Sequence, residues 1–512
     1  MTRGQTLTGE DLTVDDVWEV AVERAPAGLA DSSRMRMRAA RELVDRAASD
    51  TGEQTYGVTT GFGRFVSRTI PVDQIEELQL RLLRSHACGV GEPYPPEIVR
   101  AAMLLRANAL AKGYSGARIA TVELLVECLN RGLLPHVPSR GSVGASGDLA
   151  PLAHLALPLV GEGEAWVDGE RVPGGEALAR AGLEPIRLQA KEGLSLVNGT
   201  QFMAAFGALG LVRARRLAAA ADIACALSLE ALQGSRTSFL PQIHALRPLR
   251  GQADSAANLL RLLEGSAILE SHRWCDRVQD AYSLRCAPQV HGASRDLLEY
   301  VRATVSVELN AATDNPLVLV EDDLVVSNGN FHGQPVAFAL DAFAMAVSEL
   351  ASISERRLER LVNPGLSGGL PAFLTSDGGL NSGFMIPQYV AASLVSENKT
   401  LCHPASIDSI PTSAGQEDHV SMGNAAGLKA WQVLANSEHA LAIELLGGAQ
   451  AVEFHAPLEP GVGASTARTF LRTLSPRLRD DRPLSAEIEA VAASIRDGSL
   501  VAAVEAGVGE LV

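Results

Sequence analysis

The sequence has few cysteines, and their positions form no pattern. Its 512 residues include six scattered cysteines, with no C-x-x-C pair and no dense framework: Cys88, Cys128, Cys225, Cys275, Cys286 and Cys402. Small secreted domains that depend on disulfides carry closely spaced cysteines, and that class is excluded here. We therefore predict a protein of the reducing cytoplasm.

Long basic runs and long apolar runs are missing as well. The chain carries 44 basic and 60 acidic residues, a formal net charge of −16, and no basic run that could follow a phosphate backbone. Its first residues, MTRGQTLTGEDLTVDDVW, contain acids where a signal peptide needs an apolar core. No apolar run reaches the roughly 18 residues of a membrane span. We expect no nucleic-acid partner, no membrane partner and no anchor.

Domain linkers and the common cofactor motifs are also absent. We find no internal repeat, low-complexity tract or Pro/Ser linker, which predicts a single body over 1–512. Within it, 1–205 forms an N-terminal part and 206–512 holds the long central and C-terminal helices. Because no metal-ligand spacing, G-x-x-x-x-G-K-[ST] or G-x-S-x-G occurs, we expect no metal and no diffusible cofactor.

Long segments with apolar residues at helical spacing dominate the remaining sequence. The clearest are 206–233, 339–361 and 424–452, and the second is apolar around most of its circumference. Such a helix is typical of a bundle interior or a contact between subunits. Strand patterns are confined to 165–172, with Asp168-Gly169 at its turn, and 316–327. The prediction is a mainly α fold with a long-helix core and a few small β-hairpins.

The segment GSVGASGDLAPLAH contains an unusual tripeptide. Ala145-Ser146-Gly147 stands directly before a predicted helix that starts with Asp148 and has Pro151 in its first turn. Glycine at 147 has no Cβ, so its nitrogen can approach the carbonyl of Ala145, and loss of water from that ring and from Ser146 would leave an electrophilic methylidene. An isolated Ala-Ser-Gly is more often only a turn before a helix. The surrounding sequence has to decide between the two.

The surrounding sequence resembles the aromatic amino acid ammonia-lyases and aminomutases. The shared motifs follow the family's order over most of the chain: YGVTTGFG, GSVGASGDLAPLAH, KEGLSLVNGTQ, VQDAYSLRC, NGNFHGQP, SGFMIPQY and SIPTSAGQEDHVSMG. The resemblance implies a helical bundle of the ammonia-lyase/fumarase type and a 4-methylideneimidazole-5-one group (MIO) formed autocatalytically from Ala145-Ser146-Gly147. The Ser-Ser-x-Met-Pro-x-Lys-x-Asn loop of the fumarase group is absent.

The resemblance also assigns roles near the tripeptide. Tyr56 would be the base that removes the β-proton of the substrate, although an unperturbed tyrosine pKa of about 10 requires surroundings that lower it. Asn198 would contact the prosthetic ring and the substrate. Phe331 would form an aromatic wall beside the ring, although a lone phenylalanine is more often part of a core.

A second group of implied site residues lies later in the chain. Gln279 and Tyr282 match positions that the family places in a mobile loop of a second subunit. Arg285 is the expected partner of the substrate carboxylate, because a guanidinium can bind two oxygens at once; its structural alternative is an ordinary ion pair. The resemblance implies a homotetramer whose active sites combine loops from three subunits.

Two places bear on the substrate. The family members that act on histidine carry Ser-His where this chain has Ser85 and His86, and tyrosine or phenylalanine enzymes carry His-Leu or Phe-Leu. Glu417, after Gln416, would be buried without a partner against a phenyl ring, whereas an imidazole compensates it. Gly415 replaces the Asn or Met common in the histidine enzymes, which puts the detailed loop geometry in doubt.

The expected reaction is therefore the non-oxidative conversion of the small molecule L-histidine to trans-urocanate and ammonia, the first step of histidine catabolism. Glu417 would hold the ring or help move protons, and the sequence does not separate these roles. Two alternatives stay open: an ammonia-lyase or 2,3-aminomutase acting on tyrosine or phenylalanine, and a non-catalytic helical assembly protein. The second would have lost Tyr56, Ser146 or Arg285, and all three are present.

Overall fold

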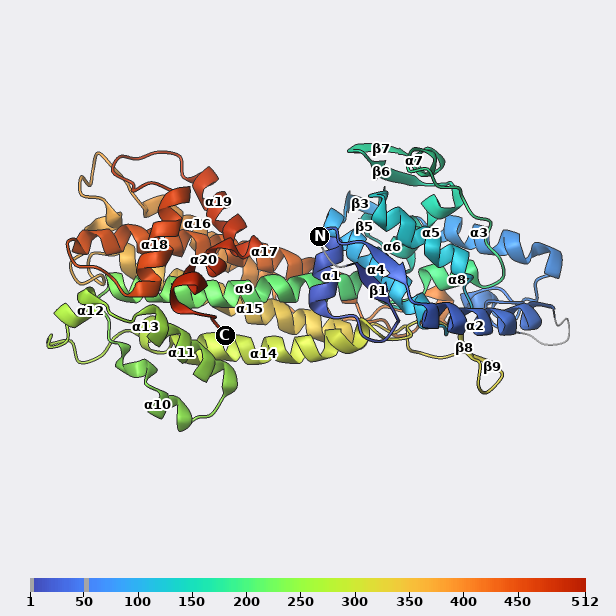
Figure 1. Ribbon diagram of the computed structural model, residues 1–512, viewed down its shortest axis with the longest axis horizontal. Helices are drawn as coiled ribbons and strands as arrows, with labels where there is room; N and C mark the ends of the chain where they lie inside the picture. Colours follow the sequence, from blue (N-terminus) through green and yellow to red (C-terminus); the bar gives the residue numbers. More distant parts are fainter. Residues whose placement is uncertain (1–3, 50–54) are drawn as a thin grey trace. The chain divides into compact units, whose positions relative to one another are not determined.

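The computed structural model describes residues 4–49 and 55–512, and the fold is mainly helical. It separates into two compact units, each discontinuous in sequence (Figure 1). The first contains the residues up to 209, 301–341 and 404–428; the second contains 210–300, 342–403 and 429–512. The chain passes between the units repeatedly, and the single body predicted over 1–512, with its parts 1–205 and 206–512, stays a prediction. The mainly α prediction is confirmed.

The first unit is built from short helices with small sheets at its surface. Its helices are α1 (Val14–Ala21), α2 (Asp31–Ser49), α3 (Ile75–His86), α4 (Pro96–Ala111), α5 (Ile119–Asn130), α6 (Leu149–Ala156), α7 (Gly174–Arg180) and α8 (Glu192–Val197). Helix α4 is buried on nearly every side, and its buried residues include the polar Arg106 and Asn108. Helix α4 therefore belongs to the core of this unit.

The strands form small sheets that belong to the first unit. Strands β1 (Gln5–Leu7) and β2 (Ala27–Leu29) pair in parallel, and β3 (Val90–Pro93) pairs antiparallel with β5 (Pro138–Arg140). Strand β4 (Leu134–Pro135) joins the hairpin of β6 (Glu164–Val167) and β7 (Glu170–Pro173), and β8 (Leu317–Leu319) pairs with β9 (Leu324–Val326). Both predicted hairpins are therefore confirmed, with Asp168 and Gly169 in left-handed conformations at the first turn.

The second unit contains long helices and a group of shorter ones. Its shorter helices are α10 (Pro241–Ala245), α11 (Arg250–Leu262), α12 (Ala267–Ser271), α13 (Tyr282–Arg285), α16 (Met385–Leu401), α18 (Val462–Leu474), α19 (Ser485–Asp497) and α20 (Ser499–Val508). The boundary between the units falls within four long helices: α9 (Gln201–Ala231), α14 (Ala287–Glu308), α15 (Gln334–Val362) and α17 (Gly423–Val452). Three of these confirm the predicted long helices to within a few residues.

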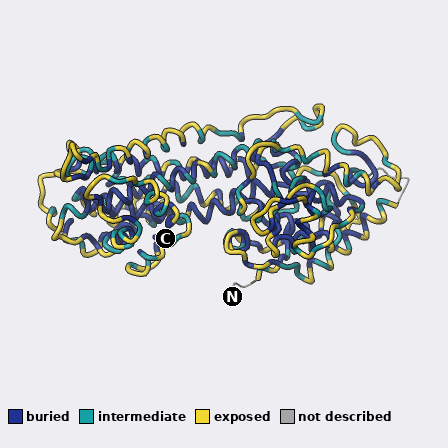
Figure 2. Tube along the Cα trace, turned by 90° about the horizontal axis from the view of Figure 1, so that it is seen from above, coloured by how far each residue is buried: buried dark blue, intermediate teal, exposed yellow. Residues whose placement is uncertain are grey.

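Buried charges connect the long helices inside the second unit. The carboxylate of Asp222 on α9 lies 2.7 Å from Nδ1 of His291 and 2.7 Å from a guanidinium nitrogen of Arg295, both on α14. Arg357 on α15 forms a fully buried ion pair with Glu444 on α17. Figure 2 shows buried residues concentrated inside the chain and exposed residues along its outer loops. Removal of one partner would leave an uncompensated buried charge, so these contacts fix which helix faces meet.

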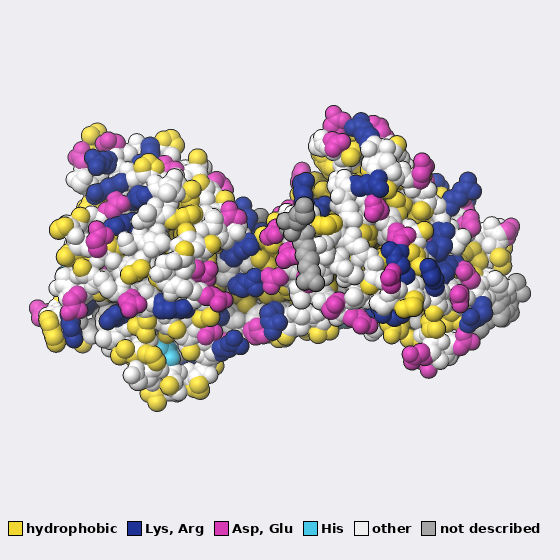
Figure 3. Space-filling view, in the orientation of Figure 1, with side chains coloured by type: hydrophobic (Ala, Val, Ile, Leu, Met, Phe, Trp, Pro, Cys, Tyr) yellow, Lys and Arg dark blue, Asp and Glu magenta, His cyan; other side chains and the backbone are white. Residues whose placement is uncertain are grey.

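Apolar surface is distributed in two ways. One window of α15 has mean hydropathy 1.7, enough by length and composition to cross a membrane, so the sequence-based statement about apolar runs was too narrow. However, 72% of that window is buried, as in a core helix of a soluble protein. The segment around α10 instead exposes Leu240, Ile243, Leu246 and Leu249, and Figure 3 shows hydrophobic side chains gathered there.

Candidate active site

The Ala145-Ser146-Gly147 loop is held in a tight left-handed turn. Ser146 has φ 52° and Gly147 has φ 75°, and Ala145 is buried. A Cβ at position 147 would lie 2.0 Å from the carbonyl oxygen of Gly199, so only glycine fits. The Gly199 amide in turn donates to the Ser146 carbonyl at 3.2 Å. The backbone here is bent and closely confined, which is the condition that the proposed ring closure needs.

Asp148 fixes the end of this loop. Its carboxylate accepts hydrogen bonds from the backbone amides of Phe202 (3.0 Å) and Met203 (3.1 Å) at the start of α9, and from Oγ of Ser142 (3.0 Å). Burial raises the pKa of Asp148 from 3.8 to about 7, although these three hydrogen bonds lower it. The predicted helix begins at Leu149, one residue later, and the Asp148 side chain caps α9 instead of its own helix.

Asn198 ends α8 beside the loop. Its Nδ2 donates to the carbonyl of Asn315 at 2.9 Å, and its own carbonyl accepts from a guanidinium nitrogen of the fully buried Arg106 at 2.7 Å. Within the described part of the chain, Oδ1 of Asn198 is buried and receives no hydrogen bond. A buried acceptor without a donor is costly, and here it stands next to the tripeptide. The side chain is thus held in place with one oxygen available.

One cavity in the first unit brings most of the predicted residues together. Its volume is about 410 Å³. The predicted residues that line it are Tyr56, His86, Ser146, Asn198 and Glu417. Among residues 4–49 and 55–512, no cluster of three or more His, Cys, Asp or Glu side chains could hold a metal ion.

Tyr56 lies in the loop before α3 and packs edge-to-face against Phe62, with ring centroids 6.4 Å apart. Burial raises the pKa of its hydroxyl, and the charges of Glu417 and Asp314 raise it further, while a hydrogen bond with the backbone of Gly63 lowers it. The sequence-based expectation of a lowered pKa is wrong for the chain by itself. Burial and two nearby carboxylates outweigh the Gly63 hydrogen bond, so Tyr56 is protonated near neutral pH.

His86 stands at the last position of α3. Its Nδ1 lies 2.9 Å from the carbonyl oxygen of Leu82, one turn earlier on the same helix, and 3.0 Å from Oγ of Ser85. The Ser85 hydroxyl donates to that carbonyl at 3.0 Å. Burial lowers the pKa of His86, although the Leu82 carbonyl and the Glu417 charge both raise it. The imidazole is therefore neutral near pH 7 and fixed in orientation.

Glu417 closes a short loop that lines the cavity. The Thr412 hydroxyl donates to Oε2 of Glu417 at 2.7 Å, and the Thr412 amide donates to the Glu417 carbonyl at 2.8 Å. Gly415, where the sequence departs from the family, has φ 84° and open space where a Cβ would stand, and its amide donates to the Thr412 carbonyl at 3.0 Å. The loop is thus closed by its own hydrogen bonds, and Ser413, Ala414 and Gly415 are all left-handed.

Other predicted residues do not line this cavity. Phe331 and Gln416 belong to the first unit but do not reach the space. Gln279 and Arg285 line a separate cavity of about 900 Å³ in the second unit, and Tyr282 is 72% exposed. Arg285 donates to the Asp280 carbonyl at 3.0 Å and lies 4.7 Å above the Tyr282 ring. Their expected roles toward a neighbouring subunit stay predictions.

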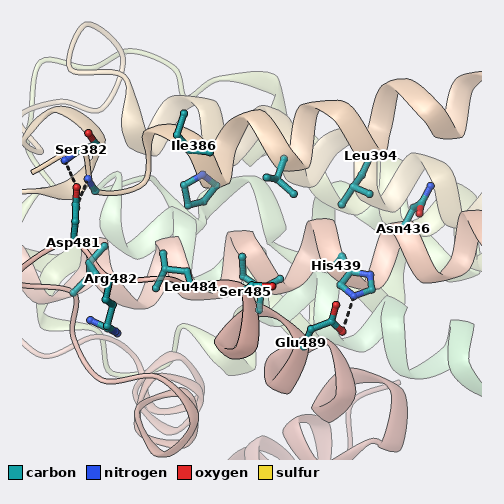
Figure 4. A pocket seen from close by; sticks show the side chains of 15 residues that line it. Ser382, Ile386, Leu394, Asn436, His439, Asp481, Arg482, Leu484, Ser485 and Glu489 are labelled. Carbon is teal, nitrogen blue, oxygen red and sulfur yellow. Dashed lines mark hydrogen bonds and ion pairs between the residues drawn. The ribbon is translucent and has the colours of Figure 1, made fainter.

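The second unit has another cavity, of about 800 Å³, between α16, α17 and α19. Figure 4 shows Leu394 of α16 across the cavity from His439, whose Nε2 lies 3.0 Å from a carboxylate oxygen of Glu489. Its lining is mostly apolar, and none of the predicted site residues belongs to it. The size of a cavity therefore does not identify the reactive site in this chain.

Sequence reasoning missed several residues that shape the site. The cavity is also lined by Phe62, Gly63, Arg64, Phe65, Leu82, Leu149, Leu194, Ser413 and Ala414. Leu82 was accessible from the sequence, since it precedes His86 by four residues and shares its helix face. Phe62 belongs to the quoted YGVTTGFG motif. Thr412 and Arg106 carry no such pattern, because their contacts join segments far apart in the chain or depend on loop closure.

Comparisons with known proteins show the family of the chain. Residues 12–474 match the model of the aromatic amino acid lyase family. The chain is 58% identical to the histidine ammonia-lyase of Gloeobacter violaceus over 505 residues, with 99% of this chain and 98% of that protein covered. It is 57% identical to the histidine ammonia-lyase of Anaeromyxobacter dehalogenans, with 96% and 99% covered.

Solved structures extend the comparison to the fold. The crystal structure of histidine ammonia-lyase from Trypanosoma cruzi matches with TM-score 0.92 and 46% identity, over 99% of this chain and 96% of that one. The tyrosine aminomutase of Streptomyces globisporus matches with TM-score 0.94 and 39% identity, and both chains are covered completely. Proteins that share only a fold have lower sequence identity than these matches, which also cover nearly all of both chains. The chain belongs to the aromatic amino acid lyase family.

Proposed function

We propose that this chain is a histidine ammonia-lyase, which eliminates ammonia from L-histidine to give trans-urocanate. The observation that carries the proposal is the 410 Å³ cavity in which His86 and Glu417 face the same space as Tyr56 and Ser146. The fold does not identify the substrate, because a tyrosine aminomutase has a similar fold. The residues that line the cavity do indicate the substrate. A carboxylate and an imidazole suit a substrate ring that carries N–H groups.

The tripeptide loop suits a prosthetic group made from the chain itself. The left-handed Ser146 and Gly147, the absence of room for a side chain at 147 and the unsatisfied Oδ1 of Asn198 all fit a cyclised Ala145-Ser146-Gly147. The MIO group would supply an electrophile for the substrate amine. Asp148, through the start of α9, would hold the loop against Gly199 so that the bent backbone persists.

Tyr56 is the proposed acceptor of the β-proton. Its position in the cavity is suitable, but its raised pKa means that the free chain holds the proton on the hydroxyl. The reaction therefore requires a change in the charges around Tyr56 when the substrate binds. Glu417 is one of the two carboxylates that raise this pKa, so pairing Glu417 with a cationic group would favour the phenolate. Base strength and substrate recognition are thereby coupled.

The second unit would complete the site of another copy. Arg285 is proposed to bind the substrate carboxylate, with Gln279 and Tyr282 beside it, and Phe331 and Gln416 to border the substrate once subunits assemble. The exposed side chains around α10 form the kind of apolar surface that a neighbouring subunit covers. We propose a homotetramer in the cytoplasm, with no nucleic-acid partner. A single copy would be inactive, because its carboxylate-binding group would be missing.

The alternative is a lyase or aminomutase acting on tyrosine, which the TM-score of 0.94 to a tyrosine aminomutase keeps in view. A paired assay of the purified protein with L-histidine and L-tyrosine, following urocanate and coumarate, separates the two. We expect urocanate with L-histidine only, and none from Ser146→Ala. Coumarate, β-tyrosine or no product from either substrate would overturn the proposal.

A further inference from the structure

Arg106 on α4 is fully buried and carries a charge. Within the described residues it forms no ion pair, and its Nε and Nη2 have no hydrogen-bond partner. The Asp314 carboxylate acts on it electrostatically but is bonded to Nζ of the buried Lys191 at 2.6 Å. Burial lowers the pKa of Arg106 from 12.5 to about 10, although Asp314 raises it, so the guanidinium is charged near pH 7. Such a charge is costly for the fold alone, and exceptions of this kind are expected at functional sites.

The bonded nitrogen of Arg106 leads to the tripeptide loop. Nη1 donates to the Asn198 carbonyl at 2.7 Å and to Oε1 of Gln201 at 3.0 Å. The carbonyl of Asn198 and the amide of Gly199 belong to one peptide group, and that amide donates to the Ser146 carbonyl at 3.2 Å. A Cβ at position 199 would lie 2.5 Å from Nη1 of Arg106, so the guanidinium needs glycine there to approach the peptide. One peptide group therefore connects the buried cation with the carbonyl of the reactive serine.

A cation at the carbonyl end of a peptide group makes the amide at the other end a stronger donor. Hydrogen bonds from an ionised donor are about twice as strong as neutral ones, and bonds in a chain polarise one another by roughly 10–30% each. Ring closure between the Gly147 nitrogen and the Ala145 carbonyl carbon would place the Ser146 carbonyl inside the ring, next to the carbon that bears the methylidene. A strong donor at this carbonyl oxygen makes the methylidene more electrophilic.

We propose that Arg106 is a positioning residue for the prosthetic group: it polarises the Asn198–Gly199 peptide and so strengthens the hydrogen bond to the Ser146 carbonyl. This inference rests on the proposed function and deepens it, because Arg106 does not line the 410 Å³ cavity and acts only through the peptide. Gln201 holds the guanidinium at the Asn198 carbonyl, since its Oε1 accepts from the same nitrogen. The reactivity of the ring thus depends on a charge that never meets the substrate.

The test compares Arg106→Lys, which keeps a cation, with Arg106→Gln, which offers a neutral amide, by two measurements that need no amino acid substrate. Intact-mass spectrometry shows whether the ring has formed, because closure and dehydration remove two molecules of water. The rate at which borohydride removes the ring absorbance then reports how electrophilic the ring is. We expect the glutamine variant to react about 10-fold more slowly than the wild type, a smaller loss than removal of a direct donor causes, and the lysine variant within about 3-fold of it.

Arg41→Gln is the matched control, because Arg41 is a buried arginine of the same unit that donates to the backbone carbonyls of Gly116 and Ala190. It should react at the wild-type rate. A ring that forms in the lysine variant and not in the glutamine variant also supports the proposal. Equal behaviour of these two variants, equal slowing in the control, or loss of folding in both variants overturns it. A wild-type chain that keeps its full mass would instead overturn the proposed ring itself.

Discussion

The two units of this chain treat their functional residues differently. In the first, Ser146 and Asp148 lie in a closely confined loop with Asn198 beside it, and the Asp148 carboxylate and the Asn198 amide nitrogen are fixed by hydrogen bonds. In the second, Tyr282 is 72% exposed, and Arg285 donates to the Asp280 carbonyl and lies over the Tyr282 ring. The first set is held in place within one copy. In the second set Gln279 and Tyr282 are exposed and Arg285 is half-buried, which suits groups that we propose to act toward another copy.

This contrast indicates how the work of the site is divided. A strained backbone or an unsatisfied polar atom persists only in a rigid, buried environment, because water would satisfy the atom and the backbone would relax. Groups that bind a charged substrate can approach from outside, because a guanidinium remains useful on a surface. Four substitutions can show whether this division is real, and the largest expected effect comes first.

Tyr56→Phe tests the buried side of the comparison. Removal of the proposed proton acceptor should lower kcat about 10²- to 10⁴-fold, with a small change in KM, because the ring is still bound by His86 and Glu417. Urocanate formation under saturating L-histidine gives the measurement. The matched control is Tyr300→Phe, on a tyrosine of the second unit outside both sets of predicted residues. Equal losses in the two variants would remove Tyr56 from the mechanism.

Asp148 should give the first unit a pH-dependent stability. Its pKa is raised from 3.8 to about 7, so its contribution is fully present below pH 4 and is lost as the pH rises through 7. One pKa unit corresponds to about 1.4 kcal/mol, so the loss is at most about 4 kcal/mol. Urea unfolding at pH 5 and pH 8 should show this decline in the wild type and not in Asp148→Asn. A parallel decline in both proteins would contradict the assignment.

Arg285→Lys tests the exposed side. Loss of the two-point contact with the substrate carboxylate should raise KM about 10- to 100-fold while a lysine still supplies charge. A sharper experiment mixes two inactive proteins, Ser146→Ala and Arg285→Ala, after dissociation and reassembly. If sites combine residues of different copies, some hybrid sites carry both native residues and activity returns. No recovery in a mixture that reassembles would show that each copy has a self-sufficient site.

Thr412→Val is expected to have the smallest effect. Loss of one hydrogen bond to Glu417 should weaken binding of the ring by about 3- to 10-fold, since the carboxylate remains but is less well oriented. Thr412→Ser, which keeps the hydroxyl, should restore wild-type affinity. A comparison of KM for L-histidine in the three proteins is sufficient. If valine and serine behave alike, the hydroxyl does not position Glu417.

Much of the fold and part of the site could be predicted from the sequence. Helical periodicity predicted α9, α15 and α17 because their burial depends on local spacing, and Asp168-Gly169 predicted a hairpin because its turn is local. Motif resemblance selected Ser146, His86 and Glu417, which do face one cavity. The roles of Gln279, Tyr282, Arg285, Phe331 and Gln416 remain predictions.

The remaining features depend on tertiary contacts. Asp148 caps α9, more than fifty residues away, and a sequence pattern only suggests that it caps the helix beside it. The pKa of Tyr56 is raised by burial and by Asp314 and Glu417, which are remote in the chain. The chain also crosses from one unit to the other within long helices, and a search of the sequence for linkers does not find such crossings. Local patterns predict elements, but the charges around a group require the fold.

The three separate stretches of the first unit have a consequence for how the protein is made. Ser146 and Tyr56 belong to the first stretch, Asp314 to the second and Glu417 to the third. On the ribosome, the reactive tripeptide is therefore synthesised long before the carboxylate that chooses its substrate. The last stretch also holds the loop, because the Met422 amide donates to the Val143 carbonyl and the Ser421 hydroxyl to the Gly144 carbonyl, so a message that stops between them would leave the first unit incomplete. A recombination that exchanges substrate preference between two relatives must likewise transfer the gene segments for both the first and the last stretch of this unit.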